Sequence, residues 1–272
     1  MARVLILSSF VAHGHVGATA AAAALQVLGH RVTVLPTVVL SNHPGWPHVG
    51  GARVPVDQLQ GMVDAIAANG WLGQQDALLT GYLPTPDHVA FAVSLVRRMR
   101  AVSPSLRCVV DPVLGDHPKG LYLSQQAAEA VRDDLVPLAD IVTPNSFELG
   151  WLTGSPVTDL VQAEQAARQL AVSGRCLLVT SPPLSQSETG LLRVDSDGIT
   201  VWSRPFLEQV PHGVGDVFSA LVCAGVTPAQ ALGYLDTLIR HSLGEDHLRI
   251  AETSAVWSKA AALAETERAH GL

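Results

Sequence analysis

The chain has 272 residues, of which 48% are hydrophobic and 15% charged, and its formal net charge is −7. This much apolar material supplies a sizeable core and excludes an intrinsically disordered chain. The sequence has no block of Lys or Arg and no apolar run of bilayer length, so we expect neither a nucleic-acid partner nor a membrane. Three widely spaced cysteines in apolar contexts, Cys108, Cys176 and Cys223, indicate reduced core thiols in a cytoplasmic protein.

The N-terminal residues predict the start of a parallel sheet. Residues 3–8 are an apolar run typical of a strand that is buried on both faces. A loop over 14–17 leads into an alanine-rich helix over 16–28, and residues 30–36 form a second strand. A strand, a helix and a strand in this order begin a parallel sheet.

Residues 39–55 interrupt this alternation. They contain Ser41-Asn42-His43-Pro44, two further prolines and Gly50-Gly51. This composition predicts a long irregular segment or a small flap, and long loops in compact domains are often lids over binding sites. A helix over 57–69 follows, with Asp57 near its N-cap.

The alternation then resumes and continues toward the C-terminus. Further strands are expected over 76–80, 107–111, 140–143 and 175–180, and as a hairpin over 189–195 and 199–203 across Asp197-Gly198. Further helices are expected over 85–101, 125–135, 160–173, 215–225, 228–243 and 247–267. Because no internal repeat or low-complexity linker divides the chain, we expect a single α/β domain over 1–272, with a mostly parallel central sheet and helices on both faces.

Polar residues end several of the expected strands. These strand ends are Ser8-Ser9, Thr80-Gly81-Tyr82, Asp111, Thr143 and Thr180. In open parallel sheets, ligands bind beyond the carboxyl ends of the strands. The sequence therefore predicts a polar rim along one edge of the sheet.

Gly213-Val214-Gly215-Asp216 leads into an expected helix. Glycines allow backbone amides to approach a ligand closely, and the unpaired N–H groups of a helix N-terminus favour an anion such as a phosphate. The helix terminus should keep Asp216 ionised at neutral pH, and the carboxylate can then accept a proton from a hydroxyl. The alternative interpretation is an ordinary glycine-rich turn with an Asp in the first helical turn, because short glycine-rich patterns are weak signals.

Further carboxylates follow two of the expected strands. Asp111 and Asp116 lie five residues apart, where they could hold Mg²⁺ through water and neutralise phosphate charge, or could simply cap a turn. Asn145 and Glu148 are three apart and share a helix face, where they could position metal-bound water. The alternative for this pair is a capping box, in which Asn145 caps the helix and Glu148 reaches back. The loop histidines His13 and His15 lack metal-ligand spacing, and we expect them to be solvated.

The order of these segments along the chain resembles that of the pyridoxal kinases, a family within the ribokinase-like superfamily. The segments extend from Arg3 to about Gly225 and are Ser9 with Gly14–Gly17, Ser41-Asn42-His43, Gly81-Tyr82-Leu83, Asp111–Asp116, Val136–Asn145 with Glu148, Thr180-Ser181 and Gly213–Asp216. The GxGD and NxxE motifs are typical of the superfamily, whereas the SNH, GYL and DPVLGD segments resemble the pyridoxal branch.

The resemblance implies a three-layer Rossmann-like α/β sandwich of the ribokinase-like type, with a substrate flap at about 39–56. It implies a kinase that phosphorylates the 5′-hydroxymethyl group of pyridoxal, and also of pyridoxine or pyridoxamine, with MgATP in vitamin B6 salvage. Family resemblance also implies a homodimer and a monovalent cation such as K⁺. Two alternatives remain open, namely a kinase for hydroxymethylpyrimidine or a related ring alcohol, and a non-catalytic homologue that binds pyridoxal phosphate or a nucleotide.

The resemblance also assigns residue roles. Asp216 would be the catalytic base, and the amides of Gly213, Val214 and Gly215 would form the anion hole. The vitamer would be bound by Ser9, His43, Tyr82 and Asp216. The nucleotide and its phosphates would be bound by Asp111, Asp116, Tyr122, Thr143, Asn145, Glu148, Thr180, Ser181, Arg204, Pro205, Phe206 and Leu207. The three carboxylates in this list, Asp111, Asp116 and Glu148, would hold Mg²⁺ through water.

The chain departs from the family pattern at three places. Pro44 follows Ser-Asn-His where a threonine is usual, which removes a hydroxyl and stiffens the flap. His212 precedes the glycine loop, where it could add a titratable group beside the phosphate or turn outward. Residues 241–252, which in the family border the adenine pocket, do not match well.

Overall fold

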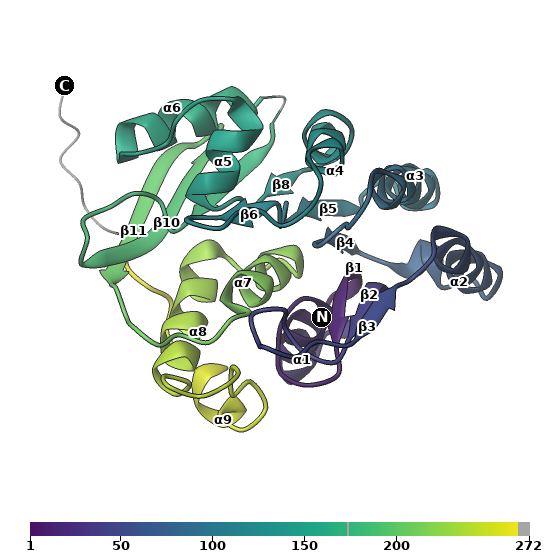
Figure 1. Cartoon of the computed structure of the whole chain (residues 1–272), viewed down its shortest axis with the longest axis horizontal. Coiled ribbons are helices and arrows are strands. Elements are labelled where there is room, and N and C mark those ends of the chain that lie inside the picture. Colours follow the sequence, from purple (N-terminus) through teal and green to yellow (C-terminus); the bar gives the residue numbers. More distant parts are fainter. Residues whose placement is uncertain (173, 266–272) are drawn as a thin grey trace.

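The structure, a computed structural model, describes residues 1–172 and 174–265 (Figure 1). Within these residues the centre is a nine-stranded sheet of order β11-β10-β9-β8-β5-β4-β1-β2-β3. Its strands are β1 (Arg3–Val11), β2 (Arg31–Leu40), β3 (Gly51–Arg53), β4 (Ala77–Thr80), β5 (Arg107–Val110), β8 (Ile141–Val142), β9 (Cys176–Thr180), β10 (Glu188–Asp195) and β11 (Gly198–Pro205). Six neighbouring strands of this sheet pair in parallel, namely β2, β1, β4, β5, β8 and β9. The strands β3, β10 and β11 join antiparallel at the two edges.

Helices cover both faces of this sheet. They are α1 (Ala18–Val27), α2 (Val56–Ala68), α3 (Pro86–Val102), α4 (Gln125–Ala130), α5 (Ser146–Thr153), α6 (Leu160–Leu170), α7 (Val214–Cys223), α8 (Pro228–Arg240) and α9 (Ser254–Trp257). Shorter elements are η1 (Leu72–Gln74), a π-helical turn η2 (Val131–Leu135), η3 (Val136–Leu138) and a separate two-stranded sheet of β6 (Gly115–Asp116) and β7 (Gly120–Leu121). None of the helices in the described part of the chain combines the length and apolar character needed to cross a membrane.

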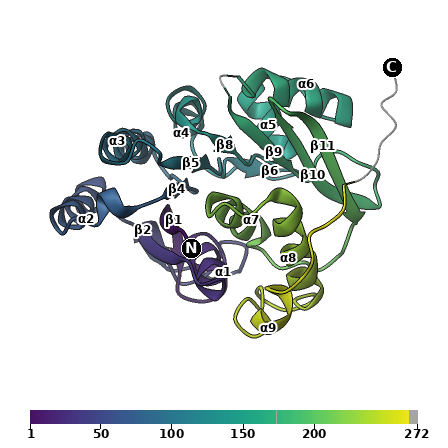
Figure 2. The same ribbon diagram turned by 180° about the vertical axis from the view of Figure 1, so that it is seen from behind.

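Two hydrophobic clusters form the layers on either side of the sheet. Side chains alternate along β1, so Leu5 and Leu7 belong to one cluster and Val4 and Ile6 to the other. The first cluster includes buried residues of α2, α3, α5 and α6, and the second those of α1, α7 and α8. Figures 1 and 2 show α2, α3, α4 and α6 on one face of the sheet, and α1, α7, α8 and α9 on the other. The predicted α/β sandwich with a mostly parallel central sheet is therefore confirmed.

The segment predicted to be irregular, residues 39–55, is partly a strand. β2 continues to Leu40, and β3 pairs antiparallel with its end, from Val38↔Arg53 to Leu40↔Gly51. The turns between these strands, residues 41–50, are largely exposed. The following helix has Pro55 at its N-cap position without a side-chain cap, and Asp57 lies near this end, in the first turn.

The helix predicted over 247–267 is wrong within the described residues, and residues 266–267 lie outside them. Only α9 is helical there, and residues 261–265 have no regular secondary structure but pack against α8. Leu263 donates its N–H to the Ala229 carbonyl at 2.9 Å. Gly233 makes this approach possible, since a Cβ there would lie 1.9 Å from the Ala261 carbonyl oxygen. Similarly, the helix predicted over 160–173 ends at Leu170, and position 173 lies outside the described residues.

Candidate active site

The register of the parallel strands brings four strand ends into one row, three of them with polar side chains. Leu7 pairs with Thr80, Thr80 with Val110, and Val110 with Val142. The next residues along these strands, Ser8, Gly81, Asp111 and Thr143, are therefore neighbours at the carboxyl edge of the sheet. This row forms the polar rim that the sequence predicts.

The N-terminus of α7 faces this edge. Its cap, Gly213, has φ +104°, and a Cβ there would lie 2.1 Å from the His15 carbonyl oxygen. A left-handed backbone in such close contact requires glycine. The loop after β1 and the start of α7 consequently pack tightly against each other.

Asp216 lies in the first turn of α7 and accepts a hydrogen bond from the Gly17 N–H, across this contact. Burial raises the pKa of Asp216 to about 6, and the Gly17 hydrogen bond opposes this rise. The carboxyl is therefore largely ionised at neutral pH and has a basicity suited to accepting a proton. The prediction that Asp216 stays ionised agrees with this geometry, although burial brings its pKa nearer to neutrality than the helix terminus alone would suggest.

A residue of α7 that the sequence motifs did not indicate, Ser219, hydrogen-bonds to Asp111. Ser219, one turn after Asp216, donates its hydroxyl to Asp111 Oδ2 at 2.8 Å. The hydroxyl of buried Thr143 lies 2.8 Å from Ser219 Oγ. Burial, followed by the charges of Glu148 and Asp216, raises the pKa of Asp111 well above its usual range. Thr143 thus supports Asp111 from within the core.

Glu148 forms the capping box that the sequence left as an alternative. Asn145 Oδ1 accepts the Glu148 N–H at 2.9 Å, and Glu148 Oε2 accepts the Asn145 N–H at 2.9 Å. Glu148 is buried, and its second oxygen accepts the Leu114 N–H at 2.8 Å. Burial raises its pKa to about 7, opposed by these backbone donors, and the Asp116 charge adds to the rise. The pair therefore caps α5 and also fixes the segment that carries Asp116, since Asn145 Nδ2 donates to the Gly115 carbonyl at 2.8 Å.

The β6–β7 hairpin adds Asp116 and Tyr122 to this cluster. Burial and a hydrogen bond to Asp116 raise the pKa of the Tyr122 hydroxyl. Asp116 Oδ1 is buried without a hydrogen-bond partner among the described residues. The unpartnered oxygen of Asp116 lies near the carboxyls of Asp111 and Glu148. A hard cation such as Mg²⁺ takes oxygen ligands, and its charge would relieve the repulsion between the three carboxyls.

His43 of the exposed segment reaches back to the glycine loop. Its ring stacks on His212 with centroids 4.1 Å apart and an interplanar angle of 29°. Burial, followed by the charges of His212 and Lys119, lowers the pKa of His43 to about 4, and burial also lowers the pKa of His212. His212 is exposed and lines a small cavity with His43 and the loop after β1, so its ring packs against the segment that carries His43. Lys119, in the β6–β7 turn, is a cation that the sequence analysis missed.

Ser9 and Tyr82 flank this region. Ser9 lies against the loop after β1, where a Cβ on Gly17 would come within 2.1 Å of Ser9 Oγ. The Tyr82 N–H donates to Ser8 Oγ at 3.2 Å, and its carbonyl accepts from Thr37 Oγ1 at 2.7 Å. These bonds fix the Tyr82 backbone at the end of β4.

A cavity of about 610 Å³ opens on the other side of the glycine loop. The residues predicted to flank a nucleotide, Thr180, Ser181 and Arg204–Leu207, line it together with Val214 and Gly215 of α7. Its apolar floor comes from α8, through Leu232, Leu235 and Ile239. Residues 241–252, expected at this border, do not line it, because α8 ends at Arg240 and the chain turns away.

The structure thus brings most of the predicted site residues to one edge of the sheet. Ser219 and the Gly17 amide could have been found from the sequence, because Ser219 is one turn after Asp216 and Gly17 belongs to the first loop. Lys119 and the floor of the cavity depend on tertiary packing, and no local pattern marks them.

Comparison with known proteins gives consistent matches. The sequence profile of the family described as phosphomethylpyrimidine kinase matches residues 17–234. A pyridoxine/pyridoxal/pyridoxamine kinase of Bordetella avium (strain 197N) is 37% identical over 233 residues, which are 84% of this chain and 79% of that protein. A pyridoxal kinase of Leifsonia xyli subsp. xyli is 33% identical over 257 residues, 92% of this chain and 89% of that protein. The structure of a pyridoxal kinase from Leishmania donovani in complex with ADP and pyridoxine matches with a TM-score of 0.88 at 29% identity, covering 96% of this chain and 97% of that chain.

Proposed function

The chain belongs to the pyridoxal kinases, within the phosphomethylpyrimidine kinase family, and we propose that it phosphorylates the 5′-hydroxymethyl group of a vitamin B6 vitamer with ATP. The observation that carries this proposal is the position of Asp216. Its carboxyl lies at the N-terminus of α7, between the cavity lined by Val214 and Gly215 and the carboxyl edge of the sheet. A nucleotide in the cavity would direct its terminal phosphate at this helix end, next to a base of suitable pKa.

In the proposed mechanism, Asp216 accepts the proton of the 5′-hydroxyl as the oxygen attacks the γ-phosphorus of ATP. The new oxygen–phosphorus bond forms as the bond to the β-phosphate oxygen breaks and ADP leaves. The amides of Gly213, Val214 and Gly215 bind the oxygens of the transferred group. Positioning and electrostatic stabilisation of this kind provide most of the catalysis in phosphoryl transfer.

The proposal assigns the metal to the carboxylate cluster. Asp111, Asp116 and Glu148 would hold Mg²⁺ through water, and the unpartnered oxygen of Asp116 supports this placement. Mg²⁺ bound to ATP neutralises phosphate charge during transfer. A monovalent cation such as K⁺ is part of the same proposal by family resemblance.

On the substrate side, Ser9, His43 and Tyr82 would contact the vitamer under a flap at about 39–56. On the nucleotide side, the adenosine would be flanked by Thr180, Ser181 and Arg204–Leu207. The phosphates of the nucleotide would be bound near Tyr122, Thr143 and Asn145. We further propose one domain over 1–272, a homodimer and a cytoplasmic location, the last supported by three free cysteines.

The direct test compares kcat/KM for pyridoxal, pyridoxine, pyridoxamine and hydroxymethylpyrimidine with MgATP. We expect at least one B6 vitamer to be the preferred acceptor. Preference for hydroxymethylpyrimidine would replace the proposed substrate with the alternative ring alcohol. Absence of turnover with all four would indicate a non-catalytic homologue, despite the intact set Asp111, Glu148 and Asp216.

The stacked histidines predict a substrate effect. We expect His212→Ala to raise KM for pyridoxal by about 2–12-fold with little change in kcat, because an aromatic pair contributes about 0.5–1.5 kcal/mol beyond its buried area. Without the His212 ring, His43 and the segment that carries it would lose their contact with the glycine loop. His212→Phe keeps a stacking ring and should restore the wild-type KM in steady-state assays. Equal KM values in the wild type and His212→Ala would contradict the role of the stack.

The rim of the cavity predicts a nucleotide effect. Phe206 is 58% exposed at the opening, although it is a large apolar side chain. We expect Phe206→Ala to raise KM for ATP by about fivefold, since one ring contact contributes on the order of 1 kcal/mol. Trp71→Ala, which removes another exposed aromatic ring away from the cavity, should leave both KM values unchanged. An unaltered KM for ATP in Phe206→Ala would exclude this cavity as the adenine site.

A further inference from the structure

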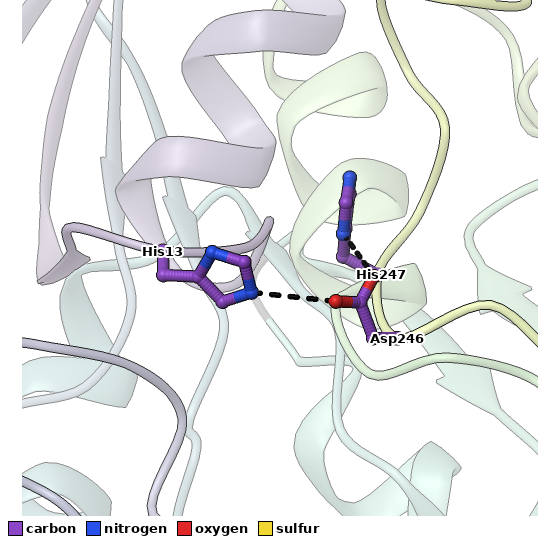
Figure 3. Close-up of side chains that lie close together, drawn as sticks. All are labelled: His13, Asp246 and His247. Carbon is purple, nitrogen blue, oxygen red and sulfur yellow. Dashed lines mark hydrogen bonds and ion pairs between the residues drawn. The ribbon is translucent and has the colours of Figure 1, made fainter.

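His13, Asp246 and His247 come together from two distant parts of the chain. His13 lies in the loop after β1, and the other two lie in the turns after α8 (Figure 3). In Figure 3 the Asp246 carboxylate stands between the two imidazole rings and is joined to each of them by a dashed line. His13 Nε2 lies 3.4 Å from Asp246 Oδ2, and His247 Nδ1 lies 2.5 Å from Asp246 Oδ1.

The three donors lie close enough together to bind one ion. One donor atom from each side chain lies within 4.8 Å of the other two. Zinc-to-nitrogen and zinc-to-oxygen bonds of about 2.0–2.1 Å at tetrahedral angles place neighbouring ligand atoms about 3.3–3.4 Å apart. The pair His13 and Asp246 already has this separation, and a small rotation of His247 would lengthen its 2.5 Å contact with Asp246 toward it.

Groups around the cluster complete the surroundings of such a site. Glu252 Oε1 lies at an ion-pair distance of 3.8 Å from His247 Nε2, and a shift of less than about 1 Å would let it accept the second ring N–H when Nδ1 binds a metal. A separate cavity of about 20 Å³ is lined by His13, Asp246 and His247 together with His15, Trp46 and His212. This volume is enough for one water-sized species, such as a fourth ligand.

We propose that His13, Asp246 and His247 bind one divalent transition-metal ion of the zinc class, with water in the fourth position. Two imidazoles and one carboxylate are typical zinc ligands, whereas the oxygen-only cluster of Asp111, Asp116 and Glu148 suits Mg²⁺. The ion would join the loop after β1 to the turns after α8. Both segments contact the glycine loop, because a Cβ on Gly213 would lie 2.1 Å from the His15 carbonyl and 3.4 Å from Leu248 Cδ1. The metal would therefore hold together the two segments that pack against the glycine loop, and so stabilise the anion hole.

The test is a Co²⁺ titration of the full chain, purified without a polyhistidine tag and stripped with a chelator, in excess Mg²⁺. Excess Mg²⁺ occupies the carboxylate cluster, so Co²⁺ reports on nitrogen-containing sites. We expect one equivalent to give the intense visible absorption of four-coordinate Co²⁺ and to be displaced by Zn²⁺. His13→Ala should weaken binding by at least about 100-fold, since loss of an outer partner alone costs about 10–100-fold, and Glu252→Gln should weaken it by about tenfold.

His30→Ala is the matched control. It removes one imidazole at the start of β2, where His30 accepts the Ala2 N–H at the opposite end of the sheet, and it should bind Co²⁺ as the wild type does. The His13 side chain is 67% exposed, so its removal leaves the core intact, as circular dichroism would verify. Absence of the absorption, or equal affinity in His13→Ala and the wild type, would overturn the proposed site. Neither outcome depends on kinase activity.

Discussion

Asp216→Asn is expected to lower kcat for pyridoxal phosphorylation by about 10²–10⁴-fold, the range associated with loss of a general base. The amide has the shape of the carboxylate and can still accept the Gly17 N–H, so folding and KM should change little. Steady-state and single-turnover assays measure the effect. If kcat fell by less than about threefold, another group would have to accept the proton.

The pH dependence provides an independent check on the same residue. Burial raises the pKa of Asp216 to about 6. Below that pH the carboxyl already carries a proton and cannot accept another, so kcat should fall about tenfold for each pH unit below 6 and reach a plateau above it. Asp216→Asn should lack this acid limb. An acid limb with the same midpoint in the variant would assign it to another group.

Gly213→Ala is expected to lower kcat by about 10²–10³-fold, the cost of losing an anion-hole donor. Gly213 has φ +104°, and the added Cβ would lie 2.1 Å from the His15 carbonyl oxygen. The loop would therefore have to move, and its amides would no longer point at the transferred phosphate. A non-glycine residue held in this region also costs of order 1–3 kcal/mol in folding free energy. Kinetics and chemical unfolding at a temperature where both proteins are folded measure the two effects.

Gly61→Ala is the control for this substitution. Gly61 lies within α2, and a Cβ there would meet nothing within 4 Å. Because alanine favours a helix by about 0.5–1 kcal/mol over glycine, stability should stay equal or rise, and activity should not change. Wild-type kcat in Gly213→Ala would show that the glycine loop does not form the anion hole.

The sheet could be predicted from the sequence because its strands are short apolar runs that end in polar residues. Residues 3–8 and 107–111 needed no tertiary information, and the register then placed Ser8 beside Gly81 and Asp111 beside Thr143. β3 could not be predicted in this way. It has three exposed residues, and only pairing with the end of β2 makes it a strand.

The C-terminal region shows where local propensity misleads. Residues 259–264 are rich in strong helix formers, which predicts a helix. Tertiary contacts override that preference, because Gly233 admits the backbone of Ala261 and the Leu263 N–H bonds to α8. The same packing brings Leu263 to the large cavity.

The carboxylate cluster was predictable as a set of residues but not as a network. Motif order indicated Asp111, Asp116 and Glu148. The buried hydroxyl of Ser219, which joins Asp111 to α7, and the backbone donors that hold Glu148 depend on how the helices pack. Likewise, no sequence spacing relates His13 to Asp246 and His247, which are 233 and 234 positions away from it.

The most direct measurement is the position of the phosphate on the product. The protein is incubated with MgATP and pyridoxal, and phosphorus–proton correlation NMR identifies the oxygen that carries the phosphate. We expect coupling from phosphorus to the 5′-methylene protons, with one ADP formed for each product molecule and with the signal building up at least about 100-fold more slowly in Asp216→Asn. Phosphate on the ring hydroxyl, or ADP formation without any phosphorylated vitamer, would contradict transfer to the 5′-hydroxymethyl group at Asp216.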